Sequence, residues 1–199
     1  NLNLQGSANI TTAADDFAWV YADTTTQHDV LYFPKSGTAV VSSVTAGQVI
    51  QVVSATKTDT FSTATNGSWV DVTGITQAIT PAATANKVRV VLTVTYSANN
   101  AAGVCVFGRV LRDATAIGVG DAAGSRILAG MHFENENADE AITVTWTWLD
   151  SPASVASTTY KFQLYLEAGT SYINRSVTDV DSVNYARYAS SITLMEVKG

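Results

Sequence analysis

The chain has 199 residues, of which 46% are hydrophobic and only 14% are charged, against about 25% charged residues in a typical globular protein. Its net charge of −6, without any cluster of lysine or arginine, excludes the basic surface that binding to nucleic acid requires. A single cysteine excludes an intrachain disulfide, and the apolar runs are far shorter than the roughly 18 residues of a membrane span, so we expect no membrane insertion.

Residues 1–46 form a segment with little apolar mass of its own. Two short strand-like pieces, 17–21 and 30–33, are separated by threonine-rich links that contain aspartate. These pieces supply too few apolar side chains for an independent core, so such a segment is stable only when it lies along another chain or another domain. We therefore expect an extended N-terminal arm or fibre-shaft segment.

Residues 47–199 contain a succession of short strands, without an amphipathic helical period longer than one turn. Turn signals separate the strands, for example at 66–68 and 112–115. This spacing is typical of an all-β domain, and we predict a head domain that is an antiparallel β-sandwich of the jelly-roll type, with about ten strands. The expected strands cover 49–53, 57–63, 69–72, 87–96, 104–111, 116–120, 125–133, 142–149, 160–167 and 190–197.

The most regular of these strands is 142–149. Trp146 and Trp148 lie on its apolar face, and three threonines occupy the opposite face. The segment 160–167 repeats this alternation of apolar and polar residues. Two strands of this kind favour an antiparallel sheet with one face in water. They predict that both tryptophans lie in the core, and an interface between subunits is the alternative place for this aromatic face.

The sequence contains no recognisable arrangement for catalysis. His28 and His132 lie in different regions without a serine or cysteine signature beside them, and there is no G-x-S-x-G motif. Cys105 lies in an apolar run and is predicted to be a buried thiol. Residues 118–124 resemble a dinucleotide-binding loop, but a strand-like segment follows where a helix is required, so we expect a glycine-rich turn. We predict no enzyme activity and no cofactor.

Two acidic groups are candidates for a divalent cation, since carboxylate oxygens are the ligands that calcium prefers. Neither group has the glycine or the ligand spacing of a known calcium loop, which favours the alternative interpretation of a solvated loop. The candidate ligands are Glu134, Glu136 and Asp139, with Glu140 beside them, and Asp179 with Asp181.

Aromatic residues outside the expected core are candidates for binding a sugar. An exposed aromatic ring stacks on the apolar C–H face of a pyranose, and the low charge of this chain leaves such rings prominent. Trp69 lies next to a turn, and three tyrosines lie in loop-rich parts of the chain. The candidate receptor-binding residues are therefore Trp69, Tyr172, Tyr185 and Tyr188.

Six segments, taken in order, carry a resemblance to a known family: 49–63, 68–90, 110–126, 149–164, 168–176 and 190–197. From Gln48 onwards, over about three quarters of its length, the chain resembles a domain family of tailed-bacteriophage structural proteins, especially tail fibres of aquatic and cyanobacterial phages. Residues 30–44 are similar to the repetitive linking segments that precede fibre tips. The matching segments are mainly strands and turns, so the resemblance implies an architecture and supplies no catalytic residue.

The resemblance implies a virion protein, a homotrimeric tail fibre whose head adsorbs to a host-surface receptor, commonly a glycan. The N-terminal segment would then contact other virion proteins. The weakly charged head fits this expectation, because surfaces between subunits are depleted of charge.

Two other functions remain open at this point. A capsid decoration protein would use the same sandwich, with its N-terminal arm along capsid subunits and no affinity for glycans. A polysaccharide-degrading tailspike would need paired carboxylates in a groove, and the only acidic clusters of this chain lie in expected loops, without the long repeat of a β-helix.

Overall fold

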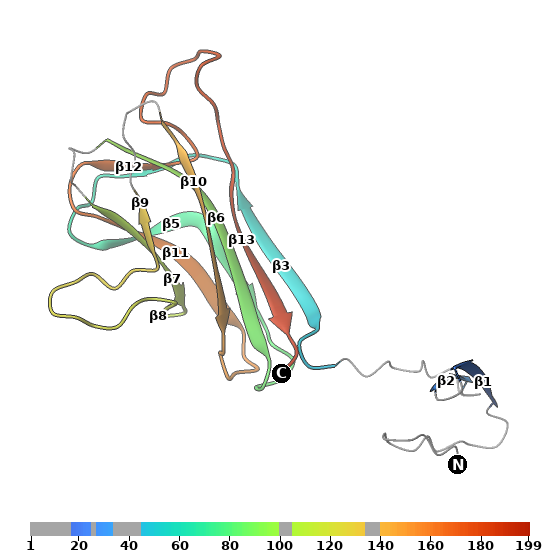
Figure 1. The fold of residues 1–199 in the computed structure, drawn as a ribbon. Coiled ribbons are helices and arrows are strands. Elements are labelled where there is room, and N and C mark those ends of the chain that lie inside the picture. Colours follow the sequence, from blue (N-terminus) through green and yellow to red (C-terminus); the bar gives the residue numbers. More distant parts are fainter. Residues whose placement is uncertain (1–16, 25–26, 34–44, 100–104, 134–139) are drawn as a thin grey trace. The chain divides into compact units, whose positions relative to one another are not determined.

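The computed structural model describes residues 17–24, 27–33, 45–99, 105–133 and 140–199 (Figure 1). The chain divides into two compact units, Asn1–Val44 and Thr45–Gly199. This division lies next to the boundary expected between residues 46 and 47. The second unit is called the head below.

The N-terminal unit contains a β-hairpin where two strand-like pieces are expected. β1 (Phe17–Thr24) pairs antiparallel with β2 (Gln27–Phe33), from Phe17 opposite Phe33 to Thr24 opposite Gln27. A single two-stranded hairpin is marginally stable in water. Whether the hairpin lies along another chain, as expected from the sequence, stays a prediction.

The head consists only of strands and connecting loops in the part of it that the structure describes. Valine, isoleucine, threonine and aromatic residues dominate these strands, and their branched or planar side chains favour an extended backbone. The eleven strands are β3 (Val49–Lys57), β4 (Phe61–Thr63), β5 (Trp69–Ile79), β6 (Lys87–Asn99), β7 (Val106–Arg112), β8 (Thr115–Ile117), β9 (Met131–Phe133), β10 (Ile142–Asp150), β11 (Thr158–Leu166), β12 (Thr170–Ile173) and β13 (Ser190–Val197).

These strands form two antiparallel sheets that pack face to face. The first has the order β3-β13-β6-β10, with β4 and β12 continuing the lines of β3 and β13, and the second has the order β5-β11-β7, with β8 and β9 on the far side of β7. If β3 with β4, β8 with β9, and β12 with β13 each count as one strand, the head has eight strands, numbered here from 1 to 8 in chain order. The sheet orders are then 1-8-3-6 and 2-7-4-5. This is the double Greek key of a jelly roll, so the predicted fold class is confirmed.

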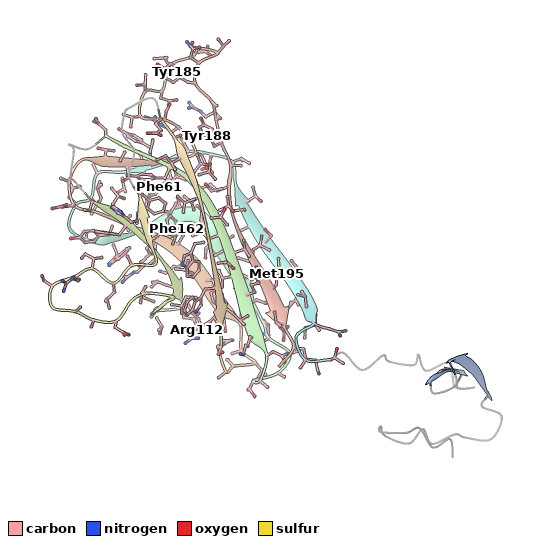
Figure 2. All side chains as sticks on the ribbon, in the orientation of Figure 1. Phe61, Arg112, Phe162, Tyr185, Tyr188 and Met195 are labelled. Atoms are coloured by element: carbon pink, nitrogen blue, oxygen red, sulfur yellow. The ribbon has the colours of Figure 1, made fainter. Side chains whose placement is uncertain are left out.

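The core lies between the sheets and is formed by the inward-facing residues of both. Val90 and Leu92 of β6 and Leu194 of β13 come from the first sheet, and Phe162 and Leu164 of β11 come from the second. Figure 2 shows Phe162 inside the sandwich. Burying each such side chain stabilises the fold by about 1.5–3 kcal/mol relative to leaving it in water.

The prediction that both tryptophans of β10 lie in the core is wrong for one of them. Trp146 packs against the core, whereas Trp148 is 45% exposed. The two rings are stacked, with centroids 6.4 Å apart, and the loop after β8 lies on them. A Cβ atom at Gly118 would lie 2.4 Å from the Trp146 ring, and its φ of +58° also requires glycine. A loop, rather than the second sheet, therefore covers this end of the tryptophan face.

Two other expectations about the second sheet need correction. Cys105 is only half-buried, because it precedes β7 at the end of the sheet rather than lying within the strand. The strand expected at 125–133 is confined to its last three residues, since the preceding stretch is an exposed loop. The glycine-rich stretch 118–124 is, as expected, not followed by a helix.

A buried ionic contact joins the two sheets at the end of the head that contains the C-terminus. Asp150, 5% exposed at the end of β10, accepts hydrogen bonds from Nη1 of Arg112 (2.9 Å) and from the hydroxyl of Tyr160 (2.7 Å). Burial raises the pKa of the Tyr160 hydroxyl, and the bond to the carboxylate raises it further, so the hydroxyl remains a donor. Both partners belong to the second sheet, so the carboxylate ties the sheets together.

We expect Asp150→Ala to lower the free energy of unfolding by about 2–4 kcal/mol, because the variant leaves a guanidinium and a buried hydroxyl without their acceptor. Urea denaturation measures the change. Asp121→Ala, in an exposed loop, is the control and should change the stability by less than about 0.5 kcal/mol. Equal stabilities of the two variants would show that the contact is not a structural tie.

Candidate functional site

The loop between β12 and β13, residues 174–189, projects beyond the ends of the sheets and is called the apical loop (Figure 1). It lies at the opposite end of the head from the C-terminus. The loop brings together Asp179, Asp181, Tyr185 and Tyr188, and Tyr172 lies on the adjoining strand β12. Figure 2 shows Tyr185 near the tip of this loop and Tyr188 closer to the sheet. Five of the predicted site residues therefore lie in one region.

Asn174 fixes the base of the apical loop. Its φ of +64° is in the left-handed region, which asparagine tolerates better than most residues, and its side chain is fully buried. Nδ2 donates to the carbonyl oxygens of Lys57 (2.9 Å) and Asp59 (3.0 Å), and Oδ1 accepts from Oγ of Ser190 (2.6 Å). The backbone N–H of Tyr188 donates to the Asn174 carbonyl, which brings the two ends of the loop together.

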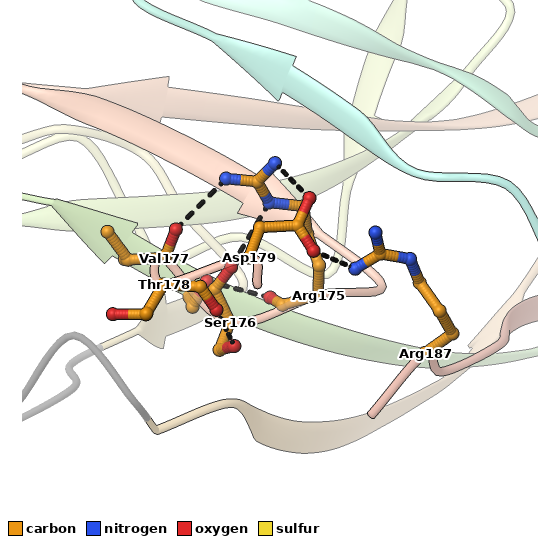
Figure 3. Close-up of polar contacts among 7 residues, drawn as sticks. Arg175, Ser176, Val177, Thr178, Asp179 and Arg187 are labelled. Atoms are coloured by element: carbon orange, nitrogen blue, oxygen red, sulfur yellow. Dashed lines mark hydrogen bonds and ion pairs between the residues drawn. The ribbon is translucent and has the colours of Figure 1, made fainter. Parts of the chain in front are cut away.

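A carboxylate between two guanidinium groups organises the loop itself (Figure 3). Arg175 donates to Oδ2 of Asp179 (2.7 Å), and Arg187 donates to Oδ1. Arg175 also donates to the carbonyl oxygen of Val177 (3.0 Å), and its guanidinium lies 4.3 Å above the Tyr172 ring. The loop is therefore held from Tyr172 to Arg187 by one connected set of contacts.

The charge of Asp179 is part of this arrangement. The hydrogen bond from Arg187, together with the positive charges of Arg175 and Arg187, holds the pKa of Asp179 below its ordinary value. The ion pairs with both arginines therefore stabilise the loop fully at a pH above the ordinary pKa of an aspartate. This stabilisation is lost as the pH falls through the lowered pKa of Asp179, where the carboxylate takes up a proton.

Trp69, the remaining aromatic candidate, lies on the other sheet, in a row of rings that crosses the outer face. Trp69 of β5 is opposite Tyr165 of β11, which is opposite Phe107 of β7, which is opposite His132 of β9. The successive ring centroids are 5.6, 6.4 and 5.3 Å apart. We call these four residues the aromatic row.

A polar network borders the aromatic row. The guanidinium of Arg109 lies 4.1 Å over the Trp69 ring, and Nε donates to Oε1 of Gln163 (2.8 Å). Gln163 donates in turn to Oδ1 of Asp71 (2.5 Å), and Lys161 donates to Oδ2 (2.6 Å). Burial alone would raise the pKa of Asp71, but the hydrogen bonds from Lys161 and Gln163 outweigh it and the pKa is lowered. The network holds Arg109 against the ring.

Metal binding finds no support in the described parts of the chain. They contain no group of three or more histidine, cysteine, aspartate or glutamate side chains placed to share a metal ion. Both oxygens of Asp179 accept from arginines, and the two positive charges disfavour a cation at Asp179 and Asp181. The other candidate ligands, Glu134, Glu136 and Asp139, lie outside the described residues. No helix in the described ranges is long and apolar enough to cross a membrane.

Several residues of these sites escaped the sequence reasoning. Tyr165 and Phe107 lie at the outward positions of strands whose alternation is visible in the sequence, so the alternation itself would have found them. Asn174 and the pairing of Asp179 with two arginines had no such signal, because they depend on where a loop returns to the sheet.

Comparisons of the chain with known protein families and with curated proteins give no match. The function is therefore argued from the geometry of the apical loop, the aromatic row and the sheet faces. None of these features is a pair of carboxylates arranged around a substrate-sized groove.

We expect Asp179→Asn to expose the apical loop to protease, because a neutral amide no longer holds two guanidinium groups. Trypsin should cleave after Arg187 several-fold faster, while the core stays intact. Asp181→Asn, in the same loop, is the matched control and should leave the rate unchanged. Equal rates for both variants, measured by mass spectrometry of a digestion time course, would contradict the organising role of Asp179.

Proposed function

We propose that this chain is a non-enzymatic structural protein of a phage virion, a trimeric tail fibre whose head adsorbs to a glycan on the host surface. The observation that carries the proposal is that the point where the chain enters the head and the apical loop lie at opposite ends of the head. The chain enters the head beside its C-terminus, where the N–H of Gly47 donates to the carbonyl oxygen of Lys198 (2.7 Å), and the apical loop lies at the opposite end. A receptor-binding head needs this arrangement, because attachment at one end leaves the opposite end and the sides of the head free for contact with a receptor.

The outer face of the first sheet supports assembly into a trimer. In a chain of net charge −6, the described outward positions of β3, β6, β10 and β13 include no aspartate or glutamate. Surfaces between subunits are depleted of charge in the same way, and a face without acidic groups avoids repulsion between like copies. The outward residues that the head itself does not cover are Val49, Ile50, Val52, Ser54, Thr56, Lys87, Arg89, Val91, Thr93, Asn99, Thr143, Thr145, Thr147, Leu149, Ser191, Thr193, Met195 and Val197.

The hydroxyl groups of this face are already paired with one another. Oγ1 of Thr93 lies 3.2 Å from Oγ1 of Thr145, and Oγ of Ser54 lies 2.9 Å from Oγ1 of Thr193. A partner that covers them removes fewer hydrogen bonds to water than it would from unpaired hydroxyls. The face is therefore suited to burial although many of its residues are polar.

The size of the face is also sufficient for a specific contact. Four strands of about eight residues cover roughly 500 Å² at the usual strand spacing and rise. Three such surfaces that meet around a threefold axis together bury roughly 1,500 Å², which is within the range of specific protein interfaces. Three heads on one fibre, and several fibres on one virion, would convert weak contacts with the receptor into strong adsorption through effective concentration.

The mass in solution tests the trimer. Light scattering should give about three times the 21.0 kDa of one chain. Thr145→Asp combined with Thr193→Asp should reduce this to the monomer mass, because like charges then meet across the interface. Thr115→Asp, on an exposed position of the second sheet, is the control and should remain trimeric. A wild-type monomer at micromolar concentration contradicts the trimer, and an intact trimer of the double variant contradicts the assigned face.

The place of the chain in the virion separates the fibre from its main rival, a capsid decoration protein. Immunogold labelling of virions with an antibody against the head should place the gold on tail fibres. Gold distributed over the capsid would overturn the tail-fibre assignment and favour a decoration protein whose N-terminal segment lies on capsid subunits. A polysaccharide-degrading tailspike predicts the release of reducing sugar from the receptor polysaccharide, which we do not expect.

A further inference from the structure

A cleft of about 610 Å³ lies beside the aromatic row. Phe107 and Tyr165 form part of its wall, and residues 125–127, from the loop between β8 and β9, form another part. Glu167 and Cys105 complete the lining. The row therefore has a hollow beside two of its rings, which a flat sheet face does not provide.

The aromatic row is long enough for more than one sugar ring. It runs across four adjacent strands, which at the usual spacing is about 14 Å between the outermost strands. Its direction is perpendicular to the strands, so a ligand in contact with several of the rings must lie across the sheet. This length exceeds one pyranose ring and suits a short oligosaccharide.

The tilt of the rings selects the kind of oligosaccharide. Trp69 and Tyr165 are inclined at 58°, Tyr165 and Phe107 at 45°, and Phe107 and His132 at 31°. A flat sugar ribbon, or the surface of a crystalline polysaccharide, cannot lie against all of these rings at once. A soluble chain with rotation between its sugar units can.

Charged groups at one end of the row and in the cleft beside its middle rings provide hydrogen bonds to sugar hydroxyls. Arg109 lies over Trp69 at one end, held by Gln163. In the cleft, one carboxylate oxygen of Glu167 accepts from the N–H of Cys105 (3.1 Å), and Arg126 is held by the carbonyl oxygen of Ala123 (3.2 Å). Carboxylate acceptors and guanidinium donors are complementary to hydroxyl groups, which both donate and accept.

We infer that the aromatic row and its cleft form a binding site for a soluble oligosaccharide of neutral pyranoses. The apolar faces of the sugar rings stack on Phe107 and Tyr165, which line the cleft, and the Trp69 ring carries the Arg109 guanidinium beside them. Glu167, Arg126 and Arg109 bind hydroxyl groups. Acidic and basic side chains both border the site, so it does not require a charged sugar. The inference rests on the proposed function, since it takes the receptor to be a glycan, and it assigns that glycan to the side of the head rather than to the apical loop.

The assembly proposed above leaves this site open. The aromatic row lies on the outer face of the second sheet, and the acid-free face belongs to the first. Because the two outer faces of a sandwich point in opposite directions, a contact through one leaves the other in solvent. Each of the three heads would then offer one site.

The experiment uses the full chain in its assembled state and a panel of soluble trisaccharides of glucose, galactose and mannose. Isothermal titration and saturation-transfer NMR should detect at least one of them. Phe107→Ala and Trp69→Ala should each weaken its binding by about three- to tenfold, the usual loss for one aromatic contact. Trp69→Phe, which keeps a ring, should retain most of the affinity. Trp148→Ala, which removes an exposed aromatic from the opposite sheet, is the matched control and should bind like the wild type.

The outcomes separate the site from the function. Weaker binding confined to the variants of the row, with unchanged melting temperature and mass, supports the site. Binding that is lost in Tyr185→Ala but unchanged in the variants of the row overturns the site and assigns the glycan to the apical loop, with the proposed function intact. No binding of any trisaccharide to the wild type also overturns the site. The proposed fibre head would still stand in that case if the protein is a trimer and the antibody against it labels tail fibres.

Discussion

The arrangement of the head depends on the backbone pairing of β6, its longest described strand. β10 pairs with one edge from Val88 to Tyr96, whereas two different strands share the other edge: β13 pairs with residues 87–93 and β12 with residues 96–99. The chain leaves the sheet at the end of β12 and returns to it at the start of β13. Thr95, at the gap, gives its carbonyl oxygen to the N–H of Asn174 and its own N–H to Oγ of Ser190. The apical loop thus exists because one line of the jelly roll is interrupted, and Asn174 and Ser190 satisfy the backbone at the interruption.

The two outer faces of the sandwich differ in the chemistry of their side chains. At its described outward positions, the first sheet presents mainly threonine, serine and valine with two basic residues and no acid, and several of its hydroxyls pair among themselves. The second presents aromatic rings bordered by an ionic network that holds Arg109 and Asp71 in place. A self-complementary surface needs few charges, and a surface for a hydroxylated ligand needs both rings and charged groups. This difference is the reason why we propose assembly through one face and ligand binding on the other.

The strand alternation in the sequence was enough to predict the fold class and most of the strands. It failed where a position depends on distant parts of the chain. Trp148 alternates correctly with Trp146, yet it is exposed because only a loop, through Gly118, reaches that end of the sheet. Cys105 looks like a strand residue but precedes the first pairing of β7. The candidate site was partly visible: the tyrosines of the apical loop and Trp69 were identified as residues, while their separation onto two surfaces follows from the jelly-roll topology.

The hydrogen bonds at the base of the apical loop have a consequence for how much its sequence and length can vary. Asn174, Tyr188 and Ser190 fix both ends of the loop in the sheet, and the contacts of Asn174 reach the corner after β3 rather than the loop interior. Changes in the length of the segment between these anchors therefore alter loop-closure entropy by only about 0.6 kcal/mol for each doubling. Val183, within the loop, is fully exposed and does not pack against the core. The head is thus a display scaffold, in which the sequence at the tip can diverge, or be replaced by a foreign peptide, without a change in the jelly roll that carries it.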